Sequence, residues 1–224
     1  MNVRLWVALD VSSQSDADAI LARLDGHRDI KVGMELFYSA GPEYVRDLIG
    51  RGYHIFLDLK CHDIPRTVAR AVGNIDRLGV ELLTVHAAGG FEMLDAACQA
   101  QGTLSLVGVT VLTSLDSKGL ADIGIFTPIA ELARVQAQAA AKAGIAGLVA
   151  SGGEVQALRQ LWPTARLVVP GIRRTGDAAG DQRRVVGAAE AVRLGASDIV
   201  VGRPITAAYD PKRVLEQFLR ELSG

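Results

Sequence analysis

Short apolar runs rich in β-branched residues alternate along the chain with longer stretches in which apolar residues recur at helical spacing. The short runs predict buried strands, and the longer stretches predict amphipathic helices. The predicted strands are residues 5–11, 30–34, 54–60, 82–86, 106–112, 147–150, 166–169 and 198–201. The predicted helices lie near residues 15–24, 42–51, 65–78, 91–101, 128–143, 154–161, 181–194 and 211–222.

A strand followed by a helix, repeated about eight times, is typical of a (β/α)₈ barrel. A doubly wound open sheet is the alternative, but no G-x-G-x-x-G follows the first predicted strand, and the regular repeat favours closure. No linker or low-complexity tract marks a second domain. We therefore expect residues 1–224 to form a single α/β domain, a (β/α)₈ TIM barrel. The glycine- and polar-rich segment 173–181 is expected to be a mobile loop.

Composition narrows the class of protein further. The chain has 24 Lys and Arg against 25 Asp and Glu, a net charge of -1, so it lacks the basic surface typical of nucleic-acid or anionic-membrane binding. Its amino terminus lacks the features of a signal peptide, and no window approaches the ~20 apolar residues of a membrane span. Cys61 and Cys98 form no disulfide framework, which suits a reducing compartment. We expect a cytoplasmic protein that binds neither nucleic acid nor membrane.

One stretch, residues 53–68, places three charges directly after a buried strand. Asp58 and Lys60 belong to that strand, where alternate side chains point the same way, and Asp63 follows its end. Pro65 suits the first turn of the next helix. A solvated ion pair is the simpler interpretation, and such pairs contribute only ~0 to 1 kcal/mol. A lysine buried beside carboxylates incurs desolvation that a fold does not need, so the pattern indicates a functional site.

Further polar residues fall at the carboxyl ends of predicted strands, where barrels of this kind place their active sites. These residues are Asp10, His86, Thr113, Ser114, Ser151, Arg173 and Arg203, and Lys31 lies early in its predicted strand. Taken singly, each has an ordinary interpretation as a helix cap, a turn former or a surface residue. Together on one rim they predict a site. His86 has no partner at a metal-ligand spacing, so we expect it to pack behind the site, and no metal centre is predicted.

The ends of the last two predicted strands indicate the ligand. Pro170 leads into the loop that carries Arg173, and Gly202 and Arg203 precede a predicted short helix at 205–208. Barrels frequently bind phosphate in this place. Gly202 permits close backbone approach, and Arg203 can add a forked, charge-assisted contact. A phosphorylated small molecule is therefore the predicted ligand.

The sequence LDLKCHDIPRTV resembles the signature of the orotidine 5'-monophosphate decarboxylase family. VALD, KVGMELF, VPGIRRTGDAAGDQRRV and VVGRPI resemble its other landmarks in the same order, from Ala8 to Ile205. The D-x-K-x-x-D core alone is shared with metal-dependent sugar-phosphate decarboxylases and aldol-type synthases. Lys31, the context of Ile64, Pro65 and Thr67, and the 173–182 loop separate this family from them. Cys61 and Arg66 depart from the usual aromatic and asparagine.

The resemblance implies cofactor-independent decarboxylation of orotidine 5'-monophosphate to uridine 5'-monophosphate (UMP) and CO₂, the last step of de novo UMP synthesis. It implies a catalytic network of Lys31, Asp58, Lys60 and Asp63. It also implies a homodimer with shared sites, because Asp63, Ile64 and Thr67 would enter the partner's site. The expected substrate contacts are Asp10 and Lys31 to ribose, Thr113 and Ser114 to the pyrimidine, and Arg173, Gln182, Gly202 and Arg203 around the phosphate. Pro170 is also expected to contact the substrate.

The chemistry agrees with this charge pattern. Loss of CO₂ leaves a carbanion at C6 in the ring plane, where π delocalisation cannot reach it, so an ammonium such as Lys60 must stabilise and then protonate it. Two alternatives stay open: a Mg²⁺-dependent sugar-phosphate enzyme on the same barrel, and a non-catalytic nucleotide-binding barrel. The second would be expected to lack Lys60 or a network carboxylate, and this sequence contains all of them.

Overall fold

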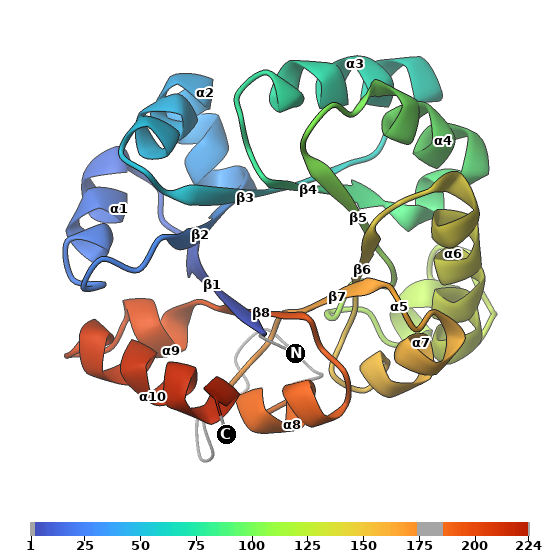
Figure 1. The fold of residues 1–224 in the computed structure, drawn as a ribbon. Coiled ribbons are helices and arrows are strands. Elements are labelled where there is room, and N and C mark those ends of the chain that lie inside the picture. The colour runs from blue at the N-terminus through green and yellow to red at the C-terminus, as the bar shows by residue number, and fades with distance from the viewer. Residues whose placement is uncertain (1–2, 174–185, 224) are drawn as a thin grey trace.

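The computed structural model describes residues 3–173 and 186–223. Eight parallel strands pair in sequence order, and β1 pairs with β8, so the sheet closes into a barrel. Figure 1 looks along the barrel axis and shows the helices as an outer ring. The predicted (β/α)₈ barrel is confirmed. The strands are β1 (Arg4–Leu9), β2 (Asp29–Gly33), β3 (His54–Cys61), β4 (Leu82–His86), β5 (Ser105–Val109), β6 (Gly147–Val149), β7 (Arg166–Val169) and β8 (Asp198–Val201).

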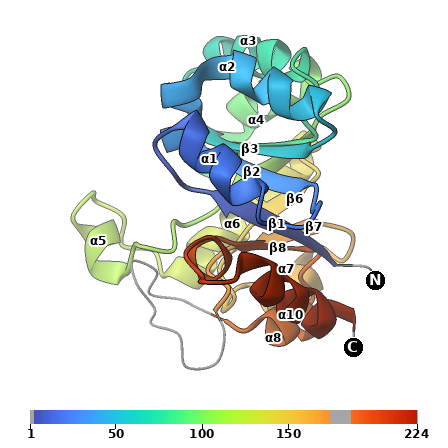
Figure 2. The same cartoon turned by 90° about the vertical axis from the view of Figure 1, so that its left-hand side faces the viewer.

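The helices lie around the barrel, and apart from α5 they cover the apolar outer face of its strands. They are α1 (Gln14–Leu21), α2 (Met34–Gly50), α3 (Pro65–Asp76), α4 (Gly90–Ala100), α5 (Ser117–Ala121), α6 (Ile129–Ala143), α7 (Val155–Leu161), α8 (Ala188–Arg193), α9 (Arg203–Thr206) and α10 (Pro211–Ser223), with a 3₁₀ turn at Ala87–Gly89. Figure 2 shows α5 projecting from the barrel at the end opposite the amino terminus.

Several helices differ from the prediction, among them α9, which covers Arg203–Thr206 where residues 205–208 were predicted. The helix predicted at 42–51 is only the second part of α2, which begins at Met34 and is interrupted at Gly41 (φ 74°). Pro42 disfavours helical backbone at the residue before it, and Gly41 adopts the left-handed region at little cost. The short α5 was not predicted. The helix predicted at 181–194 begins outside the described residues, and α8 covers its later part.

The barrel interior is filled by a separate apolar cluster. Its members are Trp6, Ala8, Phe56, Leu82, Val107, Val168 and Val200, with Val149 packed against them. The rings of Trp6 and Phe56 meet edge to face, with their centroids 5.6 Å apart. Because side chains alternate along a strand, the inward-facing Phe56 places Asp58 on the same inner face, one step nearer the carboxyl end.

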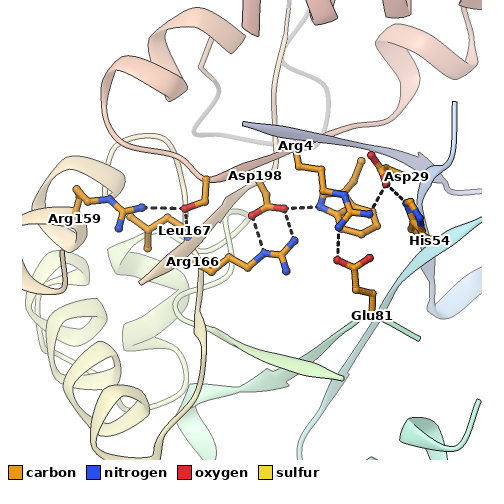
Figure 3. Close-up of polar contacts among 10 residues, drawn as sticks. Arg4, Asp29, His54, Glu81, Arg159, Arg166, Leu167 and Asp198 are labelled. Carbon is orange, nitrogen blue, oxygen red and sulfur yellow. Dashed lines mark hydrogen bonds and ion pairs between the residues drawn. The ribbon is translucent and has the colours of Figure 1, made fainter. Parts of the chain in front are cut away.

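Ion pairs close the amino-terminal end of the barrel (Figure 3). Asp198 is buried and accepts hydrogen bonds from Trp6 Nε1 and Arg166 Nε, each at 2.8 Å. The Arg4 guanidinium lies 4.2 Å from the centre of the Trp6 ring and pairs with Asp29. The opposite end of the interior is therefore the one that opens to ligands.

Two findings concern the expected environment of the protein. Within residues 3–173 and 186–223, no helix has the length and apolar character that crossing a bilayer requires. Cys61 and Cys98 are both free thiols and half-buried.

Candidate active site

A cavity of about 510 Å³ lies at the carboxyl ends of the strands. Ala8, Phe56 and Val200 of the interior cluster contribute to its wall, so the packed barrel core forms one side of the site. The predicted site residues that line it are Asp10, Lys31, Asp58, Lys60, Thr113, Ser151, Pro170, Arg173, Gly202 and Arg203. Residues that lie in or follow seven of the eight strands, distant in sequence, thus share one cavity.

Four side chains form an array of alternating charge in this cavity. Lys31 Nζ lies 3.0 Å from Asp10 Oδ1 and 3.6 Å from Asp58 Oδ2. Lys60 Nζ lies 2.9 Å from both carboxylate oxygens of Asp58. The order along the array is Asp10, Lys31, Asp58, Lys60, so each inner charge contacts two opposite charges.

The strand register brings this array together. Lys31 of β2 pairs with Ala8 of β1 on one side and Phe56 of β3 on the other. Gly33 leaves space for the pair of Lys31 and Asp10, because a Cβ atom at position 33 would lie 3.2 Å from Lys31 Nζ and 3.3 Å from Asp10 Oδ1. A side chain at position 33 would therefore crowd the first pair of the array.

Burial and charge compete in setting the protonation of the array. Burial by itself lowers the pKa of Lys31, but the carboxylates of Asp58 and Asp10 outweigh it, so the pKa is raised. Burial by itself raises the pKa of Asp58, but Lys31 and Lys60 outweigh it, so that pKa is lowered. Both groups are therefore charged at neutral pH. Fixed charges in a site of low water content can stabilise charge that develops during a reaction.

The backbone of Lys60 is irregular. Its φ is +51°, in the left-handed region that non-glycine residues seldom adopt. The pairing of β3 with β4 shifts register between Leu57 and Cys61, which marks a bulge around Lys60. The predicted contact between Asp58 and Lys60 is confirmed, but its expected basis, regular alternation along an extended strand, is wrong.

Several predicted site residues do not line this cavity within the described part of the chain. They are Asp63, Ile64, Thr67 and Ser114. Asp63 is exposed and accepts a hydrogen bond at 2.7 Å from the backbone N–H of Ile64, just before α3. Gln182 and most of the predicted 173–182 loop lie outside the described residues.

Sequence reasoning missed Thr84 of β4. This residue is fully buried and its hydroxyl contacts both Asp58 and the backbone of Lys60. The one available signal was a hydroxyl residue inside the apolar run LLTVH, next to a charged strand. Threonine is common in strands, so the signal alone would not have identified it.

His86 is not among the residues that line the cavity. It is half-buried, and its ring centroid lies 5.3 Å from that of His62. Burial lowers its pKa, and the nearby His62 adds to this effect. Within the described part of the chain, no three His, Cys, Asp or Glu side chains are grouped as metal ligands.

This chain is similar to known proteins in its sequence and in its fold. The model of the "Orotidine 5'-phosphate decarboxylase / HUMPS family" matches residues 3–218. The orotidine 5'-phosphate decarboxylase of Carboxydothermus hydrogenoformans is 43% identical over 100% of this chain and 98% of its own length. That of Synechococcus sp. (strain WH7803) is 47% identical over 99% of this chain and 96% of its own length.

Solved structures of orotidine 5'-phosphate decarboxylases are similar to this chain in fold. The crystal structure of orotidine 5'-phosphate decarboxylase from Lactobacillus acidophilus superposes with a TM-score of 0.89 at 35% identity, covering 99% of this chain and 100% of that chain. The enzyme from Pyrococcus horikoshii OT3 gives a TM-score of 0.80 at 25% identity, covering 98% of this chain and 99% of that chain.

Proposed function

Because this chain belongs to the orotidine 5'-phosphate decarboxylase / HUMPS family, we propose that it converts orotidine 5'-monophosphate to UMP and CO₂, the last step of UMP synthesis. It is a carboxy-lyase of this family. The observation that carries the proposal is the array of Asp10, Lys31, Asp58 and Lys60 in a cavity at the carboxyl ends of the strands. Such an array supplies the electrostatic stabilisation that an in-plane carbanion needs.

The proposed reaction breaks the bond between C6 and the carboxylate carbon. CO₂ leaves, and the electron pair stays on C6. The ammonium of Lys60, paired with Asp58 at 2.9 Å, stabilises this charge and then donates a proton to C6, giving UMP. The resulting amine regains a proton from water. Asp58 holds the ammonium in place, and Lys31 pairs with Asp58 from its other side. The protein supplies all the chemistry of this proposed reaction without a cofactor.

We assign the other end of the cavity to the 5'-phosphate. Arg173, Gly202, Arg203 and Pro170 line the cavity, and the two guanidinium groups suit a phosphate dianion. Binding energy from a phosphate distant from C6 can organise the site for the reaction. Gln182, outside the described residues, stays a predicted phosphate contact.

The remaining substrate contacts follow from position in the cavity. Asp10 and Lys31 form the end of the charged array away from Lys60. A Cβ atom at Gly202 would lie 3.5 Å from Asp10 Oδ2, so this end of the array is next to the proposed phosphate site, which supports the assignment of Asp10 and Lys31 to the ribose hydroxyls. Thr113 lines the cavity, which supports its assignment to the pyrimidine. Ser114 beside it is assigned to the pyrimidine by resemblance alone.

We propose that the active form is a homodimer with shared sites. Asp63, Ile64 and Thr67 do not line their own subunit's cavity among the described residues, which leaves them available to a partner. Large apolar side chains are exposed on neighbouring elements of the ring: Met34 and Tyr38 on α2, Ile64 before α3 and Phe91 on α4. Ile64 is 67% exposed and Tyr38 is 75% exposed, as expected for a surface that a second copy covers.

Two further assignments accompany the dimer. We propose that residues 1–224 act as one barrel domain, and that it works in the cytoplasm. The free thiols of Cys61 and Cys98 support a reducing compartment.

The test is the fall in ultraviolet absorbance when purified protein meets orotidine 5'-monophosphate in EDTA. Catalytic loss of absorbance, absent with unphosphorylated orotidine at equal concentration, is the expected result. Folded protein that gives no change contradicts the proposal. Turnover that appears only when Mg²⁺ is restored contradicts the cofactor-independent mechanism and favours the metal-dependent alternative.

A further inference from the structure

We propose that Thr84 is a positioning residue for Lys60: its one hydroxyl fixes the Asp58 carboxylate and the bulged backbone of Lys60 relative to each other. This inference rests on the proposed function, because it assigns Lys60 the central role in the reaction. Thr84 itself does not line the cavity, so it acts through its two partners.

The hydrogen bonds of Thr84 have a fixed direction. The backbone N–H of Lys60 donates to Thr84 Oγ1 at 2.7 Å, and Thr84 Oγ1 donates to Asp58 Oδ1 at 2.9 Å. An amide N–H can only donate, and an ionised carboxylate can only accept. The hydroxyl therefore uses a lone pair for the amide and its proton for the carboxylate, and no other orientation satisfies both.

The strand pairing shows why a side chain is needed here. Leu57 pairs with Leu83, and Cys61 pairs with Val85. Three β3 residues, 58–60, thus stand opposite the single β4 residue Thr84 in this described part of the sheet. A bulge of this kind interrupts the regular ladder, and the Thr84 hydroxyl gives the Lys60 N–H a partner in place of a backbone carbonyl.

The second hydrogen bond joins this backbone support to the charged array. With Oδ1 of Asp58 held by Thr84, both carboxylate oxygens remain 2.9 Å from Lys60 Nζ. Thr84 is fully buried, so water cannot replace its hydroxyl without rearrangement. Removing the hydroxyl should release both the left-handed backbone at Lys60 and the orientation of Asp58.

The test compares Thr84→Val, which keeps the shape and lacks the hydroxyl, with Thr84→Ser, which keeps the hydroxyl. We expect Thr84→Val to lower kcat on the order of 10- to 100-fold, the size of effect that misplaced catalytic groups produce. KM and the affinity for UMP should change little, because Thr84 does not line the cavity. Thr84→Ser should recover most of the lost kcat.

Thr110→Val is the matched control. Thr110 is also a buried threonine, and its hydroxyl donates to the backbone carbonyl of Val149 at 3.2 Å, away from the charged array. Thr110→Val loses one buried side-chain hydrogen bond, whereas Thr84→Val loses two, and Thr110→Val should keep kcat near the wild-type value. If Thr84→Val keeps wild-type kcat, or if Thr84→Ser is equally impaired, Thr84 has no positioning role.

If Thr84→Val does not fold, Thr84→Cys replaces it, because a thiol is similar in size and a weak hydrogen-bonding group; activity of Thr84→Cys equal to that of Thr84→Ser would overturn the proposal. If the wild type itself shows no turnover, the proposed function is wrong. Hydrogen exchange of the Lys60 amide then tests whether the Thr84 hydroxyl holds the Lys60 backbone. Protection of the Lys60 amide in the wild type and in Thr84→Ser, but not in Thr84→Val, supports the positioning role of Thr84. Equal protection in all three proteins refutes that role.

Discussion

The ammonium of Lys60 lies 2.9 Å from each oxygen of the Asp58 carboxylate, although a single leucine separates the two residues along β3. The bulge and the left-handed backbone at Lys60 accompany this contact. Residues in such conformations persist only where the surrounding structure holds them, and they cluster at functional sites. The local strain is thus located at the group that the proposed reaction needs most.

Replacing Lys60 by alanine should leave UMP binding measurable and reduce decarboxylation by a factor of about 10³ or more, because both charge stabilisation and proton donation are lost. Calorimetric binding and the absorbance assay measure the two effects separately. Lys212→Ala is the control, since Lys212 forms an exposed ion pair with Asp25 far from the cavity lining. Near-normal turnover of Lys60→Ala would remove Lys60 from the mechanism.

The lowered pKa of Asp58 predicts how stability depends on acid. The folded protein holds this pKa below its ordinary value of 3.8, so the carboxylate stabilises the fold above about pH 4 and loses this contribution as pH falls through the folded pKa. Asp58→Asn lacks this contribution at every pH. The difference in unfolding free energy between wild type and Asp58→Asn should therefore shrink as the pH is lowered from 6 to 3. A constant difference over that range would show that Asp58 is not held in its charged form.

The barrel could be predicted from the sequence because each buried strand is a distinct β-branched run followed by an amphipathic stretch. The helical part of α2 before Gly41 was missed because the Gly41-Pro42 pair resembles a boundary, whereas the chain continues in a second helical piece. The five residues of α5 are too few to show a helical period.

Much of the site could also be predicted, since Asp10, Asp58 and Arg203 lie at or just beyond strand ends. The individual contacts within the site could not be predicted from the sequence. The pairing of Lys31 with Asp10 depends on the register of β1 against β2, which no local pattern specifies. The left-handed backbone of Lys60 lacks a glycine signal, and the contacts of Thr84 depend on the bulge in β3.

The closed amino-terminal end predicts a separation of stability from activity. Asp198 accepts hydrogen bonds from Trp6 and Arg166 in a buried position, so Asp198→Asn should cost about 2 to 4 kcal/mol of unfolding free energy. At temperatures where the variant stays folded, its kcat should match that of the wild type, because the active site lies at the opposite end of the barrel from Asp198. Glu190→Gln, which removes an exposed pair with Arg193, should change stability by less than about 0.5 kcal/mol. Loss of kcat in folded Asp198→Asn would contradict this separation.

Shared sites predict that two inactive variants restore activity in one dimer. Lys60→Ala and Asp63→Ala are each expected to be inactive alone. In a heterodimer isolated with two affinity tags, one site would combine an intact Lys60 with an intact Asp63 from the partner chain, so about half of the wild-type activity per dimer should return. If Asp63 served its own subunit, neither site would be intact. Asp58→Asn with Lys60→Ala is the matched control: these residues contact each other within one chain, so their heterodimer should stay inactive. Heterodimers of Lys60→Ala and Asp63→Ala that form but show no activity would refute the shared site, since every other contact of the cavity is present in them.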